Sequence, residues 1–145
     1  MRGFKFYYPI QVRYGDLDAQ WHVNNSKFNT YLEQARYNYL IELGLFDGKS
    51  FLEFGLIVAD VHVAYRAPIA LDEQIRVGVR VARIGTKSIL FEYIIENSSR
   101  DEIKAQAETM MVAYDYHQLA SVPVSTQWRE TIGAFEGIDY KQPQA

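Results

Sequence analysis

Cysteine is absent from this sequence of 145 residues, and its absence excludes several kinds of chemistry together. Without a thiol there is no disulfide bond, no thiolate-bound zinc ion and no cysteine nucleophile. Disulfides are typical of small proteins in oxidising compartments, so their exclusion favours a reducing compartment. We therefore expect a cytoplasmic protein.

Long apolar runs are also missing. No stretch reaches the ~18 consecutive apolar residues that a membrane-spanning helix needs. The first residues, "MRGFKFYYPIQVRYGD", lack the apolar core and the small-residue cleavage site of a secretory signal peptide. We expect a soluble, unprocessed protein with no membrane partner.

Neither charge sign dominates the sequence. Fifteen Lys and Arg residues stand against 18 Asp and Glu residues, and the net charge of -3 provides no overall attraction to nucleic acid. None of the three histidines has a second histidine at a ligand spacing beside it, so we expect no metal site. Nucleic-acid binding and metal chemistry are therefore not expected.

The residues that are present suit an ordinary globular domain. The composition is 48% hydrophobic and 23% charged, which is too apolar for a disordered chain. A chain of this length suits one domain, which buries about two-thirds of the surface of its unfolded form. No linker or internal repeat divides the sequence, so we expect a single domain over residues 1–145.

The first third of the chain changes period once. Apolar residues at every second position predict a strand over residues 4–13. From about Asn25 to Gly44 the apolar spacing becomes three and four, which predicts a long helix that ends at the glycine. Glu33 and Arg36 fall on the expected polar side of this helix.

Beyond residue 54 the period is two, and it predicts four further strands. They lie in residues 54–68, 73–85, 87–97 and 103–115, and the tail over 127–145 reads as a short helix with a frayed end. Short connections favour antiparallel pairing. The expected apolar rows are Phe4, Phe6, Tyr8 and Ile10; Ile57, Ala59, Val61, Val63 and Tyr65; and Ile75, Val77, Val79 and Val81.

The order of one strand, one long helix and four strands favours an α+β fold. The antiparallel sheet must wrap around the single long helix, because no other segment is long enough to cover its apolar face. An open sheet edge invites pairing with another copy, so we also expect a homo-oligomer.

The connection before the long helix is unusually polar. It lies in "VRYGDLDAQWHVNNSKFNTYLEQAR", residues 12–36. A helix start offers unpaired N–H groups and a partial positive charge, which suit an anion, but either Asn24 or Asn25 also makes a good N-cap. Asp16 and Asp18 suit turns, and His22 suits an ordinary loop position. Residue types alone favour these structural roles.

The same stretch resembles a known family. Its D-x-D segment, H-V-N-N loop and E-x-A-R helix follow one another as in the hotdog-fold acyl-CoA thioesterases of the 4-hydroxybenzoyl-CoA thioesterase type. The resemblance continues through "VAYRAPIALDEQIRV", "GTKSILFEY" and "AETMMVAYD", and so covers residues 5–116. It implies the hotdog fold, a sheet wrapped around one central helix, which agrees with the element order.

The resemblance assigns roles at the start of the helix. It implies that Asp18 is the catalytic carboxylate, that Asp16 is structural, and that the backbone N–H of Asn25 polarises the thioester carbonyl. A carboxylate that attacks carbon or deprotonates water, with a donor aimed at the carbonyl oxygen, suits thioester chemistry. His22 and Asn24 would contact substrate, and neither a metal nor an organic cofactor is implied.

Two positions depart from the family pattern. Trp21 stands where most relatives have glycine, which should alter the loop or the pocket mouth. In the 4-hydroxybenzoyl-CoA thioesterase, an arginine-rich segment before the lysine-serine pair holds coenzyme A phosphates, but here Gly85 and Thr86 stand at those positions. The pair itself, Lys87 and Ser88, is kept, with Arg83 nearby. Lys87 and Arg83 would bind those phosphates, or would form an ordinary solvated strand end.

Three functions follow from the resemblance. The first is hydrolysis of an acyl-CoA or acyl-carrier-protein thioester to acid and thiol by a homodimer or homotetramer. The second is a hotdog hydratase or dehydratase, and the third is a non-catalytic acyl-thioester binding protein. Glu33 could replace Asp18 as base, although an i,i+3 pair with Arg36 is its simpler role. The acyl group is not specified by the sequence.

Overall fold

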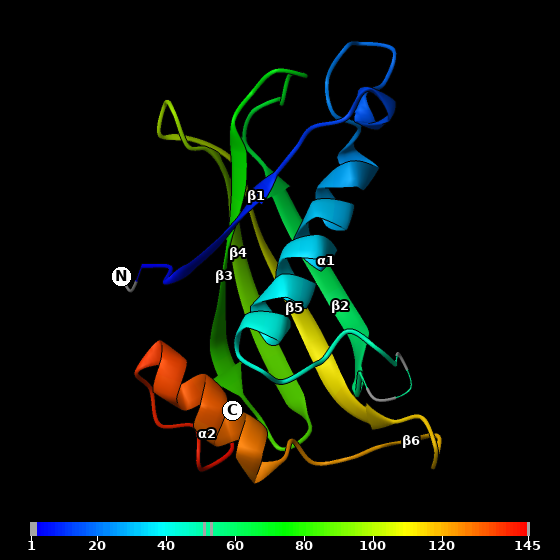
Figure 1. Cartoon of the computed structure of the whole chain (residues 1–145), viewed down its shortest axis with the longest axis vertical. Helices are drawn as coiled ribbons and strands as arrows, with labels where there is room; N and C mark the ends of the chain where they lie inside the picture. Colours follow the sequence, from blue (N-terminus) through cyan, green and yellow to red (C-terminus); the bar gives the residue numbers. More distant parts are fainter. Residues whose placement is uncertain (1–2, 51, 53, 145) are drawn as a thin grey trace.

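The computed structural model describes residues 3–50, 52 and 54–144, and its elements follow the predicted order (Figure 1). They are β1 (Phe6–Ile10), the 3-10 helix η1 (Tyr14–Asp16), α1 (Asn25–Glu42), β2 (Leu56–Tyr65), β3 (Ile75–Ile84), β4 (Ser88–Asn97), β5 (Glu102–Asp115), β6 (Ala120–Ser121) and α2 (Thr126–Glu136).

The five long strands form one antiparallel sheet in the order β1-β3-β4-β5-β2, and the short β6 pairs with the end of β5. Helix α1 lies along one face of this sheet, and α2 closes one end (Figure 1). This arrangement confirms the predicted α+β hotdog fold. It leaves β1 and β2 as the two edges.

Helix α1 has the predicted limits because both ends are capped. The side chain of Asn24 accepts a hydrogen bond of 2.9 Å from the N–H of Ser26, which makes Asn24 the N-cap. Gly44 follows the last turn with φ +74°, a conformation that glycine adopts without strain.

The core lies between α1 and the inner face of the sheet. The predicted stripe of α1 is buried there, and full burial of one large apolar side chain contributes roughly 1.5–3 kcal/mol. The central contacts come from Phe28, Leu32, Ala35 and Tyr39 of α1 and from Val77, Val79, Val81, Ile89, Phe91 and Met111 of the sheet.

Strand β1 is shorter than the predicted range of 4–13, and Phe4 lies on the opposite face from the prediction. Its ring packs on the outer face of the sheet, 4.3 Å from the guanidinium carbon of Arg80. Gly78 makes this possible, since a Cβ there would lie 2.9 Å from the Phe4 ring. Phe6, Tyr8 and Ile10 face the core as predicted.

In strand β2 the burial of side chains follows the expected alternation in only one half of the strand. A bulge between Val58 and Asp60 shifts the register by one residue, so Leu56 is buried, whereas Ile57 of the expected apolar row is only half-buried. Val63 packs against the core as expected. The central residues Val58–His62 are exposed at the sheet edge.

The C-terminal segment is not frayed, contrary to the sequence prediction. Helix α2 is capped by Ser125 and Gly137, and the chain beyond it is fixed to β3. The Tyr140 hydroxyl donates to the carbonyl of Val81 at 2.8 Å, and the N–H of Gln144 donates to the carbonyl of Ile84 at 2.8 Å.

Arg36 is buried, although its position on α1 predicted an exposed side chain. Only 5% of its surface is accessible, and its Nη1 donates to the Tyr93 hydroxyl at 3.1 Å. Burial raises the pKa of the Tyr93 phenol above its ordinary value, against the charge of Arg36. No ion pair joins Arg36 to Glu33 in the described part of the chain, so the expected i,i+3 pair is absent.

Candidate active site

The polar connection folds as a small hairpin beside the start of α1. Leu17 and Val23 form an antiparallel bridge. The N–H of Asp18 donates to the carbonyl of His22 at 2.9 Å, and the N–H of Trp21 donates to the carbonyl of Asp18 at 3.0 Å. In such three-residue loops the last position is left-handed, and Trp21 has φ +64°. Glycine is the residue that favours positive φ, so Trp21 occupies a position where glycine would fit without strain.

The start of α1 leaves a backbone donor available. The cap bond uses the N–H of Ser26, and none of the hydrogen bonds among the described residues uses the N–H of Asn25. Asn25 is exposed, at the positive end of an 18-residue helix. Its carbonyl accepts a bond of 3.2 Å from the Tyr65 hydroxyl, which fixes this residue against β2.

Asp18 is held in a turn and also faces a cavity. Its Oδ1 accepts a hydrogen bond of 2.9 Å from the N–H of Gln20, as the turn interpretation predicted. Within the described residues Oδ2 takes part in no hydrogen bond. A cavity of about 500 Å³ brings this carboxylate together with the start of α1; its lining includes Asp18, Gln20, His22, Asn24, Asn25, Phe28, Tyr65 and Arg66.

Asp16 stabilises the segments on both sides of this hairpin through hydrogen bonds. Its carboxylate accepts hydrogen bonds from the N–H of Arg13 at 3.0 Å and from the hydroxyl of Tyr31, while its carbonyl accepts from the N–H of Asn24. Burial, together with the bond to Asp16 and its negative charge, raises the pKa of Tyr31 far above its ordinary value. The phenol therefore stays protonated and donates, which agrees with a structural role for Asp16.

The connection between β2 and β3 holds the hairpin on the other side. The N–H of Val23 donates to the carbonyl of Ile69 at 2.9 Å, and the buried Lys104 ammonium donates to that of Pro68 at 2.9 Å. Lys104 also pairs with Glu73 at 2.8 Å. Burial by itself raises the pKa of Glu73, but hydrogen bonds from Lys104, Ala70 and Asn97 and the Lys104 charge together lower it to about 2.

The predicted phosphate-binding residues lie at the other end of the sheet. Arg83, Lys87 and Ser88 surround the turn between β3 and β4, whereas the hairpin contacts the chain just before β3. The ten residues of β3 span roughly 30 Å at ~3.3 Å per residue. Arg83 is exposed, and Lys87 donates to the Ser121 hydroxyl at 3.3 Å. Within one chain, therefore, Arg83, Lys87 and Ser88 lie far from Asp18.

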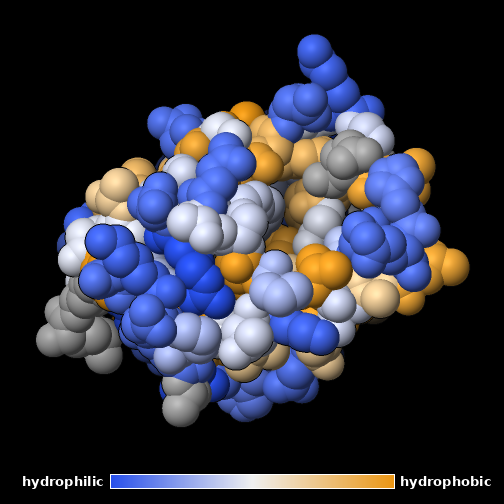
Figure 2. Space-filling model, turned by 90° about the horizontal axis from the view of Figure 1, so that it is seen from below, coloured by the Kyte–Doolittle hydropathy of each residue, from blue (hydrophilic) through white to orange (hydrophobic). Residues whose placement is uncertain are grey.

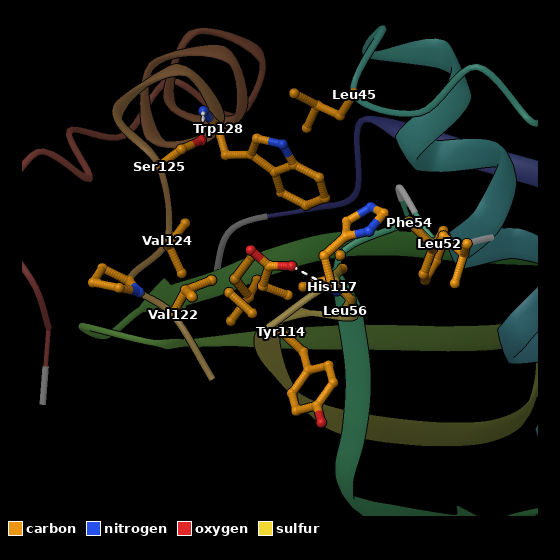
Figure 3. Close-up of a pocket in the computed structure, with 15 residues that line it drawn as sticks. Leu45, Leu52, Phe54, Leu56, Tyr114, His117, Val122, Val124, Ser125 and Trp128 are labelled. Carbon is orange, nitrogen blue, oxygen red and sulfur yellow. Dashed lines mark hydrogen bonds between the residues drawn. The ribbon is translucent and has the colours of Figure 1, made fainter. Parts of the chain in front are cut away.

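A second, apolar cavity opens at that far end. It has a volume of about 280 Å³, and Trp128 of α2 faces Leu45 across it (Figure 3). Hydrophobic residues gather in a hollow on this end of the molecule (Figure 2). Its lining includes Leu45, Leu52, Phe54, Leu56, Val122, Val124 and Trp128, and the one carboxylate there, Asp115, accepts a bond from the N–H of His117. It also contains Ser125, the N-cap of α2, but its lining is mainly apolar, whereas the hairpin cavity combines Asp18 with polar side chains and the start of the longer helix α1. The hairpin cavity is therefore the stronger catalytic candidate.

Two further features bear on the reaction class. Among the residues that the structure describes, no three His, Asp or Glu side chains gather closely enough to hold a metal ion. No helix in the described chain is long and apolar enough to cross a membrane. Glu33, the alternative base, is exposed and does not line the hairpin cavity.

The sequence and the fold place the protein among thioesterase-like proteins. The model of the Thioesterase-like superfamily matches residues 12–132. The protein belongs to this superfamily, which confirms the predicted relationship to the hotdog thioesterases.

Individual relatives agree with this membership. The long-chain acyl-CoA thioesterase FadM of Escherichia coli is 24% identical over 85% of this chain and 93% of its own. A thioesterase from Thermus thermophilus, crystallised with coenzyme A and zinc, is 31% identical, with a TM-score of 0.82 over 94% of this chain and 98% of its own. A 1,4-dihydroxy-2-naphthoyl-CoA thioesterase from Synechocystis shares the fold, with a TM-score of 0.78, 19% identity and coverage of 88% and 94%.

Sequence reasoning missed several residues of this site. Tyr65 and Arg66 line the hairpin cavity; the sequence left Tyr65 open between a pocket-lining ring and core packing, and gave Arg66 no role. Lys104 and Glu73 support the site from separate segments. A lysine at a strand position next to alanine was the available signal, since buried lysine needs a partner.

Proposed function

We propose that the protein hydrolyses an acyl-CoA thioester to a free acid and coenzyme A. The observation that carries this proposal is the shared cavity of the Asp18 carboxylate and the Asn25 N–H at the start of α1. A thioester carbonyl between them would meet an oxyanion donor on its oxygen and a carboxylate beside its carbon. A well-placed donor of this kind contributes about 10²-fold or more to the rate.

The chemistry has two balanced forms. In one, an Asp18 oxygen attacks the carbonyl carbon, the C–S bond breaks, the thiolate takes a proton from solvent, and water cleaves the resulting anhydride. In the other, Asp18 takes a proton from the water that attacks the carbon, and then returns it to the leaving sulfur. Both use the Asn25 N–H for the developing oxyanion. Hydrolysis in ¹⁸O water under single-turnover conditions detects the first form, since label enters Asp18 only when water attacks the Asp18 carbon of the anhydride.

The second part of the proposal is a dimer that pairs two β2 edges. The exposed run Val58–His62 offers unpaired strand edge, and Val58 and Val61 add apolar surface. Antiparallel pairing centred near Val61 sets Ile57 of one copy opposite Tyr65 of the other. The hairpin cavity of each copy then adjoins the far end of the other copy.

Such a dimer gives the predicted cations a role. Lys87, Ser88 and Arg83, which lie at the far end in one chain, would approach the Asp18 cavity of the second copy and bind the coenzyme A phosphates. Exposed His22 and Asn24 line the hairpin cavity, where they would contact the amide-rich arm of the thiol. An acyl carrier protein would present the same arm, so coenzyme A and carrier thioesters are to be compared.

The test is thiol release from a panel of acyl-CoA thioesters by the parent protein, Asp18→Asn and Asp16→Asn. We expect Asp18→Asn to keep the fold and to lose turnover by orders of magnitude. Asp16→Asn keeps an oxygen acceptor for Tyr31 and should reduce turnover less, or reduce stability instead. Equal turnover of Asp18→Asn and the parent would disprove the assignment. Binding of thioesters by the parent without thiol release would favour the non-catalytic alternative.

A further inference from the structure

The hairpin carries a side chain that its own backbone disfavours. Trp21 has φ +64°, a region where a bulky residue is a conformational outlier and glycine fits. Burial does not compensate for this strain, because 66% of the Trp21 surface is exposed. Strained residues that the fold does not need are concentrated at functional sites. The indole therefore calls for a functional explanation.

A second exposed ring accompanies it. Tyr14 is 71% exposed, and its ring centre lies 6.3 Å from that of Trp21 at an angle of 64°. This edge-to-face geometry is favourable for aromatic pairs, and it leaves ring surface open to a third group. The two rings form a cavity of about 310 Å³, completed by Leu17, Asp18 and Ala19.

Asp18 links this aromatic cavity to the hairpin cavity, because it lines both. The hairpin cavity contains polar and charged groups, among them His22 and Arg66. A thioester carbon beside Asp18 carries two substituents, the sulfur with its amide-rich arm and the apolar acyl group. Complementarity assigns the arm to the polar cavity and the acyl group to the aromatic one.

We propose that Tyr14 and Trp21 form the acyl-binding cavity and select a ring-bearing acyl group over a straight chain with the same number of carbons. This inference rests on the proposed hydrolysis at Asp18. A cavity of about 150 Å³ already holds a benzene ring, so about 310 Å³ accommodates an aromatic acyl group. All five lining residues lie within residues 14–21, which makes the cavity short for a long chain.

The test compares benzoyl-CoA with heptanoyl-CoA, which have equal numbers of acyl carbons, in the parent and in Trp21→Gly. Glycine suits the left-handed position, so this variant keeps the hairpin. We expect the ratio of kcat/KM for benzoyl-CoA to that for heptanoyl-CoA to fall by roughly 3- to 10-fold, the factor that one aromatic contact supplies. The control is Leu119→Gly, which removes another exposed side chain at positive φ, far from the hairpin.

A binding experiment separates this inference from the proposed hydrolysis. S-benzyl-CoA and S-heptyl-CoA lack the carbonyl and cannot be hydrolysed, and the parent should prefer the benzyl compound while Trp21→Gly loses that preference. An unchanged preference in Trp21→Gly overturns the inference, as does a preference that is lost in Leu52→Ala of the far cavity instead. A changed assembly mass with unchanged preference would make the aromatic pair a subunit contact. Failure of the parent to hydrolyse any thioester would refute the hydrolysis alone.

Discussion

The hydroxyl of Tyr31 donates a hydrogen bond of 2.7 Å to the carboxylate of Asp16. Tyr31 lies in the second turn of α1, and Asp16 ends η1, so this bond connects the segment before the hairpin to the side of the helix. The carbonyl of Asp16 also receives the N–H of Asn24, the helix cap. One residue therefore sets both the hairpin and the helix start.

Tyr31→Phe tests this connection. Loss of a hydrogen bond to a charged group should cost about 1.5–3 kcal/mol of unfolding free energy. Displacement of Asp18 relative to the Asn25 N–H should lower kcat, by at most roughly 100-fold for a shift near 1 Å, with KM less affected. Thermal unfolding and steady-state kinetics measure the two effects. Tyr37→Phe, on the same helix but away from the hairpin, is the control; an equal kcat loss there would contradict the argument.

Lys87→Ala should raise KM for acyl-CoA and spare kcat, the pattern of lost uniform binding. The contact is exposed, so the effect should be modest and should weaken with salt. A truncated thioester without the nucleotide should be unaffected. Equal slowing of both substrates would show that Lys87 supports the fold or the chemistry.

Mixed dimers test whether Lys87 serves the other copy. A hybrid of Asp18→Asn and Lys87→Ala chains has one site with both residues intact only if they come from different chains. We expect exchange of the two variants to restore a fraction of sites with the parent KM. If Lys87 served its own chain, the hybrid would show only the raised KM of Lys87→Ala.

Val61→Lys should weaken the dimer, because charge at the centre of an exposed β2 edge opposes strand pairing. Light scattering should show a shift toward the mass of one chain, accompanied by loss of acyl-CoA turnover. Tyr7→Lys on the outer face near the other edge is the control. A parent protein that is monomeric at micromolar concentration and active would refute the dimer itself.

Glu73→Gln should change acid stability in a defined direction. The pKa of Glu73 falls from 4.5 to about 2, so its ionised form stabilises the fold above pH 4.5, and this contribution is lost as the pH falls toward 2. The unfolding temperature of the variant should lie below that of the parent at neutral pH and approach it in this acid range. Glu102→Gln, the more exposed partner of Lys104, should have a smaller effect. A difference in unfolding temperature between Glu73→Gln and the parent that stays constant down to pH 2 would contradict the pKa assignment.

The order of elements was predictable because each segment keeps one period over many residues. Helix α1 shows this well: its apolar spacing and its asparagine cap both lie in the local sequence, and the structure confirms both. The β2 bulge was not predictable, since the alternation of Ile57, Ala59 and Val61 is unbroken in sequence. Its inserted residue becomes evident only through pairing with β5.

Side chains that depend on distant partners were predicted less well. Its spacing puts Arg36 on the polar side of α1, yet the side chain is buried and donates a hydrogen bond to the Tyr93 hydroxyl on β4. Phe4 continued an alternating row, but the space above Gly78 was not visible from local pattern. At the candidate site, the structure brings Asp18, His22, Asn24 and Asn25 of the predicted stretch to one cavity, whereas the support from Lys104 was not predicted.

The turn between β3 and β4 is tied into the protein more firmly than most surface turns. The carbonyls of Gly85 and Thr86 accept from the buried Arg129 guanidinium, and the N–H of Val124 donates to Thr86 as well. Loops usually diverge by insertion and deletion. An added residue here would break three contacts with α2 and the chain leading to it, so divergence at this end of the fold should proceed by side-chain replacement at constant loop length.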